Sequence, residues 1–229
     1  FYIGAGYGIK KNPPLIAVEN SPVGSYKRTF TIPDNWKDKQ IILYFGSVAS
    51  AFYVWINGEK VGYSQDSKTP SEFDITSYVK KGENQIAVQV FKFSDGYYLE
   101  DQDFWRMAGI QRDVYVYARP KTFIRDYEVV TDLDKSYKDA KFKLFVELGS
   151  MKSVPQSSTV EIEISDLKGN KVYKERKQAA KGTKEISFEK DIKSPLLWSA
   201  ESPNLYRMNL CLSETGKPQQ YISQYIGFR

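Results

Sequence analysis

Histidine is absent from this chain of 229 residues, and its absence removes several kinds of catalytic site. Without an imidazole there is no Ser-His-Asp or Cys-His nucleophile, no histidine-ligated zinc, and no histidine to exchange protons near neutral pH. A pair of carboxylates is the catalytic arrangement that this composition still allows.

Cysteine is nearly absent too. The single Cys211 excludes a disulfide within the chain and a metal site built from several thiolates. Because Cys211 stands between Leu210 and Leu212, we expect it to be a small core residue.

Long apolar runs are also lacking. None approaches the roughly 20 residues that cross a bilayer, so we expect no membrane partner. The chain begins with Phe1 and shows no positively charged, apolar leader, which leaves its compartment open. We favour the cytoplasm over the periplasm.

Neither sign of charge dominates the chain. The 33 basic and 28 acidic residues give a net charge of +5. The lysine-rich stretch 168–184 contains Glu175, and its only aromatic ring is Tyr173. Nucleic-acid grooves combine clustered cations with stacking rings, so we expect no nucleic-acid partner. A hydrophobic content of 41% predicts a packed core, and the length favours two domains.

Short alternating runs and frequent turns predict an all-β fold. In residues 51–56, Phe52, Val54 and Ile56 share one face and Tyr53 and Trp55 the other. The following Asn57-Gly58 pair is a strong hairpin signal. In the first half, further strands are expected at 26–32, 41–45, 60–64, 85–93 and 113–118.

Pro120 marks a domain boundary, and the second half repeats the β pattern. Its candidate strands are 124–131, 141–148, 159–165, 171–177, 183–188, 206–212 and 221–226. Seven short strands over about a hundred residues indicate an immunoglobulin-like sandwich without a disulfide. The first half, with a glycine- and proline-rich arm at 1–25, indicates a sandwich or jelly roll.

Residues 94–113 hold five acidic residues, four aromatic rings and two arginines between two expected strands. Carboxylates accept hydrogen bonds from sugar hydroxyls, and flat rings stack against C–H groups, so this mixture suits a sugar-facing surface. The alternative is a structural loop in which the acids pair with the arginines.

Segments along nearly the whole chain resemble the N-terminal region of the β-galactosidases of glycoside hydrolase family 2. The matching motifs are Phe45–Phe52, Trp55–Gly58, Val61–Ser67, Pro70–Asp74, 94–113, Leu197–Tyr206 and Tyr225–Arg229. The resemblance implies a jelly-roll sugar-binding domain at 1–120 and an immunoglobulin-like sandwich at 121–229. It also implies a (β/α)8 barrel, absent from these 229 residues, that carries the two catalytic glutamates of a retaining mechanism.

The same resemblance implies a role for Asp95. In the family, the aspartate of the Ser-Asp-Gly motif contacts galactose and a bound sodium ion shared with the barrel, which also holds magnesium. A carboxylate is a hard oxygen ligand, and Gly96 permits a tight loop. In the alternative, Asp95 only caps a turn. No catalytic residue is expected within this chain.

The rest of the loop is expected to hold Asp95 in place. We expect Glu100, Asp101 and Asp103 to pair with the loop arginines, and Trp105 to pack beside Phe104. The residues of this support are Glu100, Asp101, Asp103, Trp105, Arg106 and Arg112.

One position departs from the family pattern. Ala49 stands where the best-known members have an asparagine that contacts sugar. An alanine side chain cannot form a hydrogen bond. The contact is therefore lost, moved, or replaced by a neighbour such as Ser47 or Ser50.

The expected function is that of a non-catalytic N-terminal part of a β-galactosidase, which hydrolyses terminal non-reducing β-D-galactose residues. The expected partners are a β-galactoside, the barrel domain and further copies of the parent chain. Two alternatives stay open: a stand-alone carbohydrate-binding module, and a relative of β-glucuronidase or β-mannosidase.

Overall fold

The computed structural model forms two compact units, Phe1–Arg119 and Pro120–Arg229. It describes residues 12–16, 19, 21–100, 107–151 and 155–229. Over these residues the fold is all-β, as predicted, and its short 3-10 helices include η2 (Asp34–Trp36) and η3 (Asp95–Tyr98). In these described ranges, no helix combines the length and the apolar character that crossing a bilayer requires.

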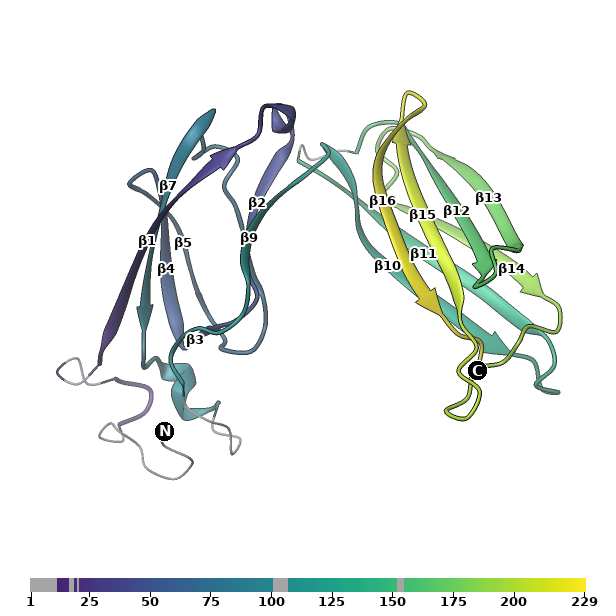
Figure 1. The fold of residues 1–229 in the computed structure, drawn as a ribbon, viewed down its shortest axis with the longest axis horizontal. Coiled ribbons are helices and arrows are strands. Elements are labelled where there is room, and N and C mark those ends of the chain that lie inside the picture. Colours follow the sequence, from purple (N-terminus) through teal and green to yellow (C-terminus); the bar gives the residue numbers. More distant parts are fainter. Residues whose placement is uncertain (1–11, 17–18, 20, 101–106, 152–154) are drawn as a thin grey trace. The chain divides into compact units, whose positions relative to one another are not determined.

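The first unit is a jelly-roll sandwich of antiparallel strands (Figure 1). One sheet has the order β1-β7-β4-β5 and the other β6-β2-β9, and β3 pairs with β8. The strands are β1 (Val23–Ile32), β2 (Gln40–Phe45), β3 (Val48–Ala49), β4 (Ala51–Ile56), β5 (Glu59–Gln65), β6 (Ser71–Asp74), β7 (Gly82–Phe91), β8 (Gly109–Ile110) and β9 (Val114–Arg119).

Strand β4 shows why the sequence forms this sandwich. Phe52, Val54 and Ile56 are buried in the core, while the intervening residues lie half-buried on the outer face, as the alternation predicts. Asn57 and Gly58 have φ values of 52° and 89°, the positive angles that a tight type I′ hairpin requires. The predicted hairpin into β5 is confirmed.

The second unit is an immunoglobulin-like sandwich, and all seven predicted strands are present. One sheet has the order β10-β11-β14 and the other β13-β12-β15-β16. The strands are β10 (Thr122–Leu133), β11 (Ala140–Ser150), β12 (Ser158–Asp166), β13 (Lys171–Ala179), β14 (Glu185–Ile192), β15 (Tyr206–Glu214) and β16 (Lys217–Ile226).

A short turn joins β12 to β13. Asp166 Oδ1 accepts hydrogen bonds from the backbone N–H of Lys168 at 2.9 Å and of Asn170 at 2.8 Å. Gly169 has φ of 90°, a conformation that glycine adopts without steric cost. This turn closes the hairpin of β12 and β13.

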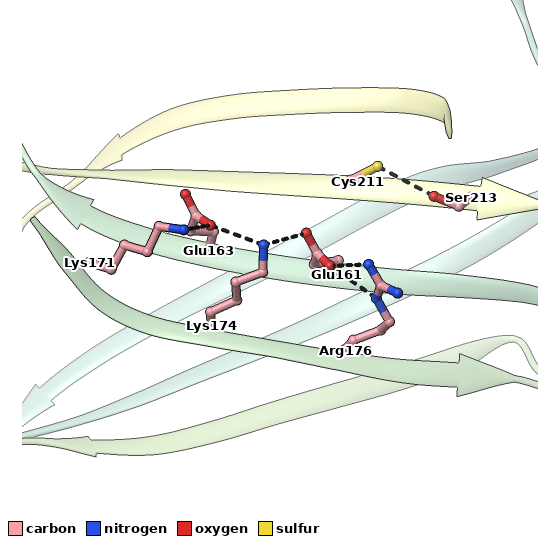
Figure 2. A network of polar contacts seen from close by, with 7 residues as sticks. All are labelled: Glu161, Glu163, Lys171, Lys174, Arg176, Cys211 and Ser213. Carbon is pink, nitrogen blue, oxygen red and sulfur yellow. Dashed lines mark hydrogen bonds and ion pairs between the residues drawn. The ribbon is translucent and has the colours of Figure 1, made fainter. Parts of the chain in front are cut away.

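The prediction that Cys211 is a core residue is wrong. Its neighbours Leu210 and Leu212 are fully buried, but successive side chains of a strand point to opposite faces. Cys211 therefore lies half-buried on the outer face of β15, with Sγ 3.5 Å from the Ser213 hydroxyl (Figure 2). Parity along the strand decides its position, not the apolar neighbours.

An ion-pair network covers the outer face of β12 and β13. Figure 2 shows Lys174 between two glutamates, 3.0 Å from Glu161 and 3.2 Å from Glu163. Arg176 also pairs with Glu161, at 2.6 Å, and Lys171 with Glu163, at 3.3 Å. Part of the positive charge of the lysine-rich stretch is thereby neutralised within the sheet.

We expect this network to make the stability of the second unit depend on pH. The pKa of Glu161 is held below its usual value mainly by a hydrogen bond from Lys174 and to a lesser extent by one from Arg176. In the same way, Lys174 and, more weakly, Lys171 lower the pKa of Glu163. A lowered carboxyl pKa stabilises the folded form above the unfolded pKa of 4.5, and this stability is lost as pH falls through the folded pKa. Thermal unfolding measured from about pH 6 to pH 3 should show this loss.

The matched control for this prediction is Glu128→Gln, since Glu128 is an exposed carboxylate of the same unit. Glu161→Gln should flatten the acid-induced decrease in melting temperature, and Glu128→Gln should leave it unchanged. If the melting temperature decreases equally steeply with falling pH in both variants, the network adds nothing to stability.

Candidate functional site

The turn that carries Asp95 follows directly from the end of β7. Ser94 is extended, and its carbonyl accepts a hydrogen bond from Tyr97 N at 3.0 Å. The carbonyl of Gly96 accepts hydrogen bonds from the N–H groups of Leu99 and Glu100, both at 2.9 Å. These bonds form η3 and place Asp95 at its exposed first position.

Two aromatic side chains hold this turn to the rest of the first unit. The buried Phe93 packs edge-to-face against Tyr97, with ring centroids 4.7 Å apart. The Tyr98 hydroxyl donates to the Leu15 carbonyl at 2.9 Å and accepts from Asn12 N at 3.2 Å. The turn is therefore joined both to the core and to the segment before β1.

Asp95 combines a local cap with a free oxygen. Its Oδ1 accepts a hydrogen bond from Gly96 N at 2.9 Å, which is the turn cap of the alternative interpretation. Among the described residues, no hydrogen bond to its Oδ2 is present. Capping the turn therefore leaves one carboxylate oxygen of this exposed residue free for a hydroxyl group or a cation.

Tyr63, which was not singled out from the sequence, is close enough to feel the charge of Asp95. Burial raises the pKa of the Tyr63 hydroxyl, and the negative charge of Asp95 raises it further, so the two groups interact. Tyr63 donates a hydrogen bond to Gln65 Oε1 at 2.6 Å. Strand parity gave the available signal, because residues 63 and 65 share the outer face of β5.

Ser94 has an unmet hydrogen-bonding requirement next to Asp95. Ser94 is 8% exposed, and its Oγ has no hydrogen-bond partner among the residues that the structure describes. A buried hydroxyl without a partner costs free energy that a ligand or water can recover. Gly96 lies close by, since a Cβ at this position would stand 3.4 Å from Ser94 Oγ.

Glu100 is held by a residue far away in the sequence. Its Oε1 accepts a hydrogen bond from Ser67 N at 2.9 Å, and its Oε2 accepts one from the Ser67 hydroxyl at 2.5 Å. The Ser67 carbonyl in turn accepts a hydrogen bond from Ser47 Oγ at 2.6 Å. Ser67, which the sequence analysis did not identify, is thus the partner of Glu100 among the described residues, and the expected pairing of Glu100 with the loop arginines stays a prediction.

We expect Glu100→Ala to destabilise the first unit by about 1–3 kcal/mol, because it leaves the N–H and hydroxyl of buried Ser67 unpaired. Glu100→Gln keeps one acceptor oxygen and should cost less. Chemical denaturation checks both, with Glu59→Ala on the exposed part of β5 as control. Equal losses for alanine and glutamine would contradict this role.

The centre of the loop lies outside the described residues. This applies to Asp101, Asp103, Trp105 and Arg106, so their expected ion pairs and packing stay predictions. Arg112 is the remaining residue of the expected support, and its Nη1 donates to the Lys68 carbonyl at 3.2 Å.

Gln111 is a further support that sequence reasoning missed. Its backbone N–H donates to the Ser47 carbonyl at 3.0 Å, and its Nε2 donates to the Met107 carbonyl at 2.5 Å. Both described ends of the loop are therefore joined to Ser47 or to the turn at 67–68.

Ala49 is buried in β3, where it pairs with Gly109 of β8. The two serines proposed as substitutes for an asparagine there are already engaged. Ser47 Oγ donates to Ser67 O, and Ser50 Oγ donates to the Phe91 carbonyl at 3.2 Å. Neither hydroxyl is thus an evident replacement for the sugar contact.

The donor set around Asp95 fits one part of a cation site. In the described part of the chain, no three acidic, histidine or cysteine residues gather where they could hold a metal ion. Hard cations such as calcium take several oxygen ligands, and Asp95 offers one free carboxylate oxygen. Asp95 is therefore suited to be one ligand of an ion whose other ligands come from elsewhere.

The two motifs of the second half meet in space. Leu197 forms a parallel bridge with Phe228, and Trp198 N donates to the Phe228 carbonyl at 2.8 Å. The Arg229 guanidinium lies 5.4 Å from the centre of the Trp198 ring. Phe228 is fully buried and Trp198 is half-buried, so these motifs complete the packing of the second unit.

Residues 1–120 match the protein-family model described as "Glycosyl hydrolases family 2, sugar binding domain". Residues 122–229 match the model described as "Glycosyl hydrolases family 2". Together the two models cover both compact units.

Similar proteins point the same way. A β-galactosidase of Priestia megaterium is 46% identical over 95% of this chain and 22% of its own length. One of Clostridium acetobutylicum is 44% identical over 95% of this chain and 24% of its length. Among solved structures, a β-glycosidase from Bacteroides vulgatus is 27% identical with a TM-score of 0.74. A β-glucuronidase from Bacteroides uniformis is 25% identical with a TM-score of 0.78. Each match covers 90% of this chain and 26% of the other protein. The chain thus spans about a quarter of these relatives.

Proposed function

Because the chain belongs to glycosyl hydrolase family 2, we propose that it is the N-terminal part of a β-galactosidase acting on terminal β-D-galactose residues. The observation that carries this proposal is the 46% identity to a β-galactosidase across 95% of the chain. The β-glucuronidase likeness, at 25% identity, is much weaker. The substrate of the galactosidase relatives is therefore favoured over a β-glucuronide or a β-mannoside.

In this proposal the chain binds and positions the sugar, and the bond is broken elsewhere. A retaining glycosidase needs two carboxylates about 5–5.5 Å apart across the scissile bond. The two glutamates for this step belong to a (β/α)8 barrel, where magnesium also binds. In the site described above, Glu100 is already engaged by Ser67, so it supports the loop and does not react.

Asp95 makes the chain's own contribution to the sugar site. Its free oxygen accepts a hydrogen bond from a galactose hydroxyl, and a charged acceptor makes such a bond strong. A sodium ion held in part by Asp95 would supply positive charge beside the sugar. Ser94, Gly96 and Glu100 keep Asp95 in position through the turn. The barrel and further copies of the parent chain are the proposed protein partners.

Two parallel assays test this proposal. The 229-residue chain and a full-length polypeptide that carries it are each incubated with chromogenic β-galactoside, β-glucuronide and β-mannoside. We expect turnover only by the full-length polypeptide and fastest on the β-galactoside. Turnover by the 229-residue chain would refute its non-catalytic role, and a preference for β-glucuronide would refute the substrate.

A stand-alone carbohydrate-binding module is the second candidate. The observation in its favour is that exposed Asp95 is close enough to Tyr63 for its charge to raise the pKa of that hydroxyl, and the Tyr63 ring packs at a tilt against Tyr53 with centroids 4.8 Å apart. Calorimetric titration of the 229-residue chain with galactose and lactose separates the two. Millimolar or tighter binding that disappears in Asp95→Ala would favour the module, whereas we expect no measurable binding.

A further inference from the structure

An open groove of about 860 Å³ lies between the two sheets of the first unit. We name it the β1–β9 groove, since residues 25–31 of β1 and 114–116 of β9 line it. Its apolar lining includes Leu43, Phe45 and Val88, which belong to the core of the unit. These three residues are buried beneath the groove, whose exposed apolar lining includes Tyr26 of β1 and Val114 of β9.

Both strands that flank the groove are sheet edges. In the sheets formed by the described residues, β1 pairs only with β7, and β9 pairs only with β2. An edge of ten residues such as β1 exposes a row of unpaired N–H and C=O groups, which natural sheets cover or interrupt. The groove therefore has unpaired backbone groups beside an apolar floor.

The free backbone groups of β1 can be assigned from one hydrogen bond. Lys92 N donates to the Pro22 carbonyl at 3.0 Å, which makes residues 22 and 92 a hydrogen-bonded pair. Such pairs alternate along an antiparallel ladder, so even-numbered residues of β1 bond to β7. The groups that point to the free edge belong to Ser25, Lys27, Thr29 and Thr31.

The free backbone groups of β9 also follow from one hydrogen bond. Gly46 N donates to the Asp113 carbonyl at 3.0 Å, so residues 46 and 113 are a hydrogen-bonded pair at the end of the β2–β9 ladder. Such pairs alternate along the ladder, so the odd-numbered residues of β9 bond to β2. The backbone groups of Val114, Val116 and Ala118 consequently point to the free edge.

The groove also has an unbalanced charge. Arg28 is opposite Ile86 in the register, and Tyr26 is opposite buried Val88, so the Arg28 side chain is on the interior face of β1. No acidic residue lines the groove, and no ion pair to Arg28 is present among the described residues. A cation facing an apolar interior needs an acidic partner if the groove is covered.

We propose that an extended polypeptide segment covers the β1–β9 groove as an added β-strand, with apolar side chains inward and an acidic side chain against Arg28. The added strand bonds to the free backbone groups of β1 at Lys27 and Thr29, and its apolar side chains cover the apolar lining of the groove. The matched region is only 22% of the Priestia megaterium relative, so most of such a protein lies outside these residues. We assign the strand to that remaining polypeptide and not to a second copy of this chain.

A labelled peptide of about nine residues serves as the probe, with valine, phenylalanine and one central glutamate at the alternate positions that face inward and threonine at the others. Fluorescence anisotropy measures its binding to the 229-residue chain, and amide exchange reports on Lys27 and Thr29. We expect saturable binding and slower exchange at these two amides. A second peptide, N-methylated at the residues that face β1, should bind at least about tenfold more weakly because it cannot donate those hydrogen bonds.

Protein variants give an independent comparison. Thr29→Pro removes a free edge N–H, which an edge strand tolerates, and should weaken binding at least about tenfold. The matched Thr29→Ala keeps the N–H and should bind within about twofold of the unchanged chain. Arg28→Glu should weaken binding of the glutamate peptide and strengthen binding of a peptide with lysine in place of the glutamate.

Three results would overturn the proposal. One is no binding up to about 1 mM by a chain that melts cooperatively. Another is equal binding of the N-methylated and unmodified peptides. The third is a dimer of the 229-residue chain that Thr29→Pro dissociates, which would show that a second copy occupies the groove.

Discussion

In the full-length polypeptide that carries this chain, Asp95→Asn is expected to lower kcat/KM for a β-galactoside by about 10- to 100-fold. Asparagine keeps the size of the side chain but removes its charge. A hydrogen bond to a charged group contributes about 1.5–3 kcal/mol, and each 1.36 kcal/mol corresponds to about tenfold in rate. The sodium concentration for half-maximal activity should rise in parallel, because the amide is a weaker ligand for a hard cation.

Asp126→Asn is the matched control for this prediction. Asp126 is also exposed, and its Oδ1 accepts a hydrogen bond from the next backbone N–H, Tyr127 N, at 2.8 Å, as Asp95 does from Gly96. The control should leave both kcat/KM and the sodium dependence unchanged. If Asp95→Asn behaves like this control, Asp95 only caps its turn.

Phe228→Ala is expected to lower the free energy of unfolding of the second unit by about 3–5 kcal/mol. The ring is fully buried and packs edge-to-face against Tyr206, with centroids 5.2 Å apart. Its removal leaves a cavity under the bridge to Leu197. Denaturant unfolding of the 229-residue chain, followed by tryptophan fluorescence, measures the loss.

Tyr225→Ala removes another large ring from the same terminal motif, but this ring is 53% exposed. We expect its cost to be below about 1 kcal/mol, since surface substitutions seldom exceed this range. Similar losses for the two variants would mean that Phe228 is not the residue that holds the two motifs together.

Local pattern was sufficient to predict most of the fold. The alternation of residues 51–56 and the Asn57-Gly58 pair identified β4, its buried face and its hairpin, because both signals depend only on neighbouring residues. The prediction for Cys211 was wrong because it rested on apolar neighbours and ignored strand parity.

The site could be predicted only in part. Asp95 was named through a family resemblance, and its chemistry suits that role. The hydrogen bonds from Ser67 to Glu100 join residues 33 positions apart, so no local pattern predicts them. The charge of Asp95 acts on Tyr63 because β5 and the turn after β7 meet in three dimensions, which no local pattern predicts either.

The ion pairs between β12 and β13 also bear on the order in which the second unit folds. Glu163 and Lys174 are 11 residues apart and joined by a tight turn, whereas β12 meets β15 through pairs such as Thr159 and Ser213. Contacts between residues close in sequence require less loop closure and form faster. The β12–β13 hairpin is consequently the part of this sandwich in which native pairing can begin, with β15 and β16 added to an existing template.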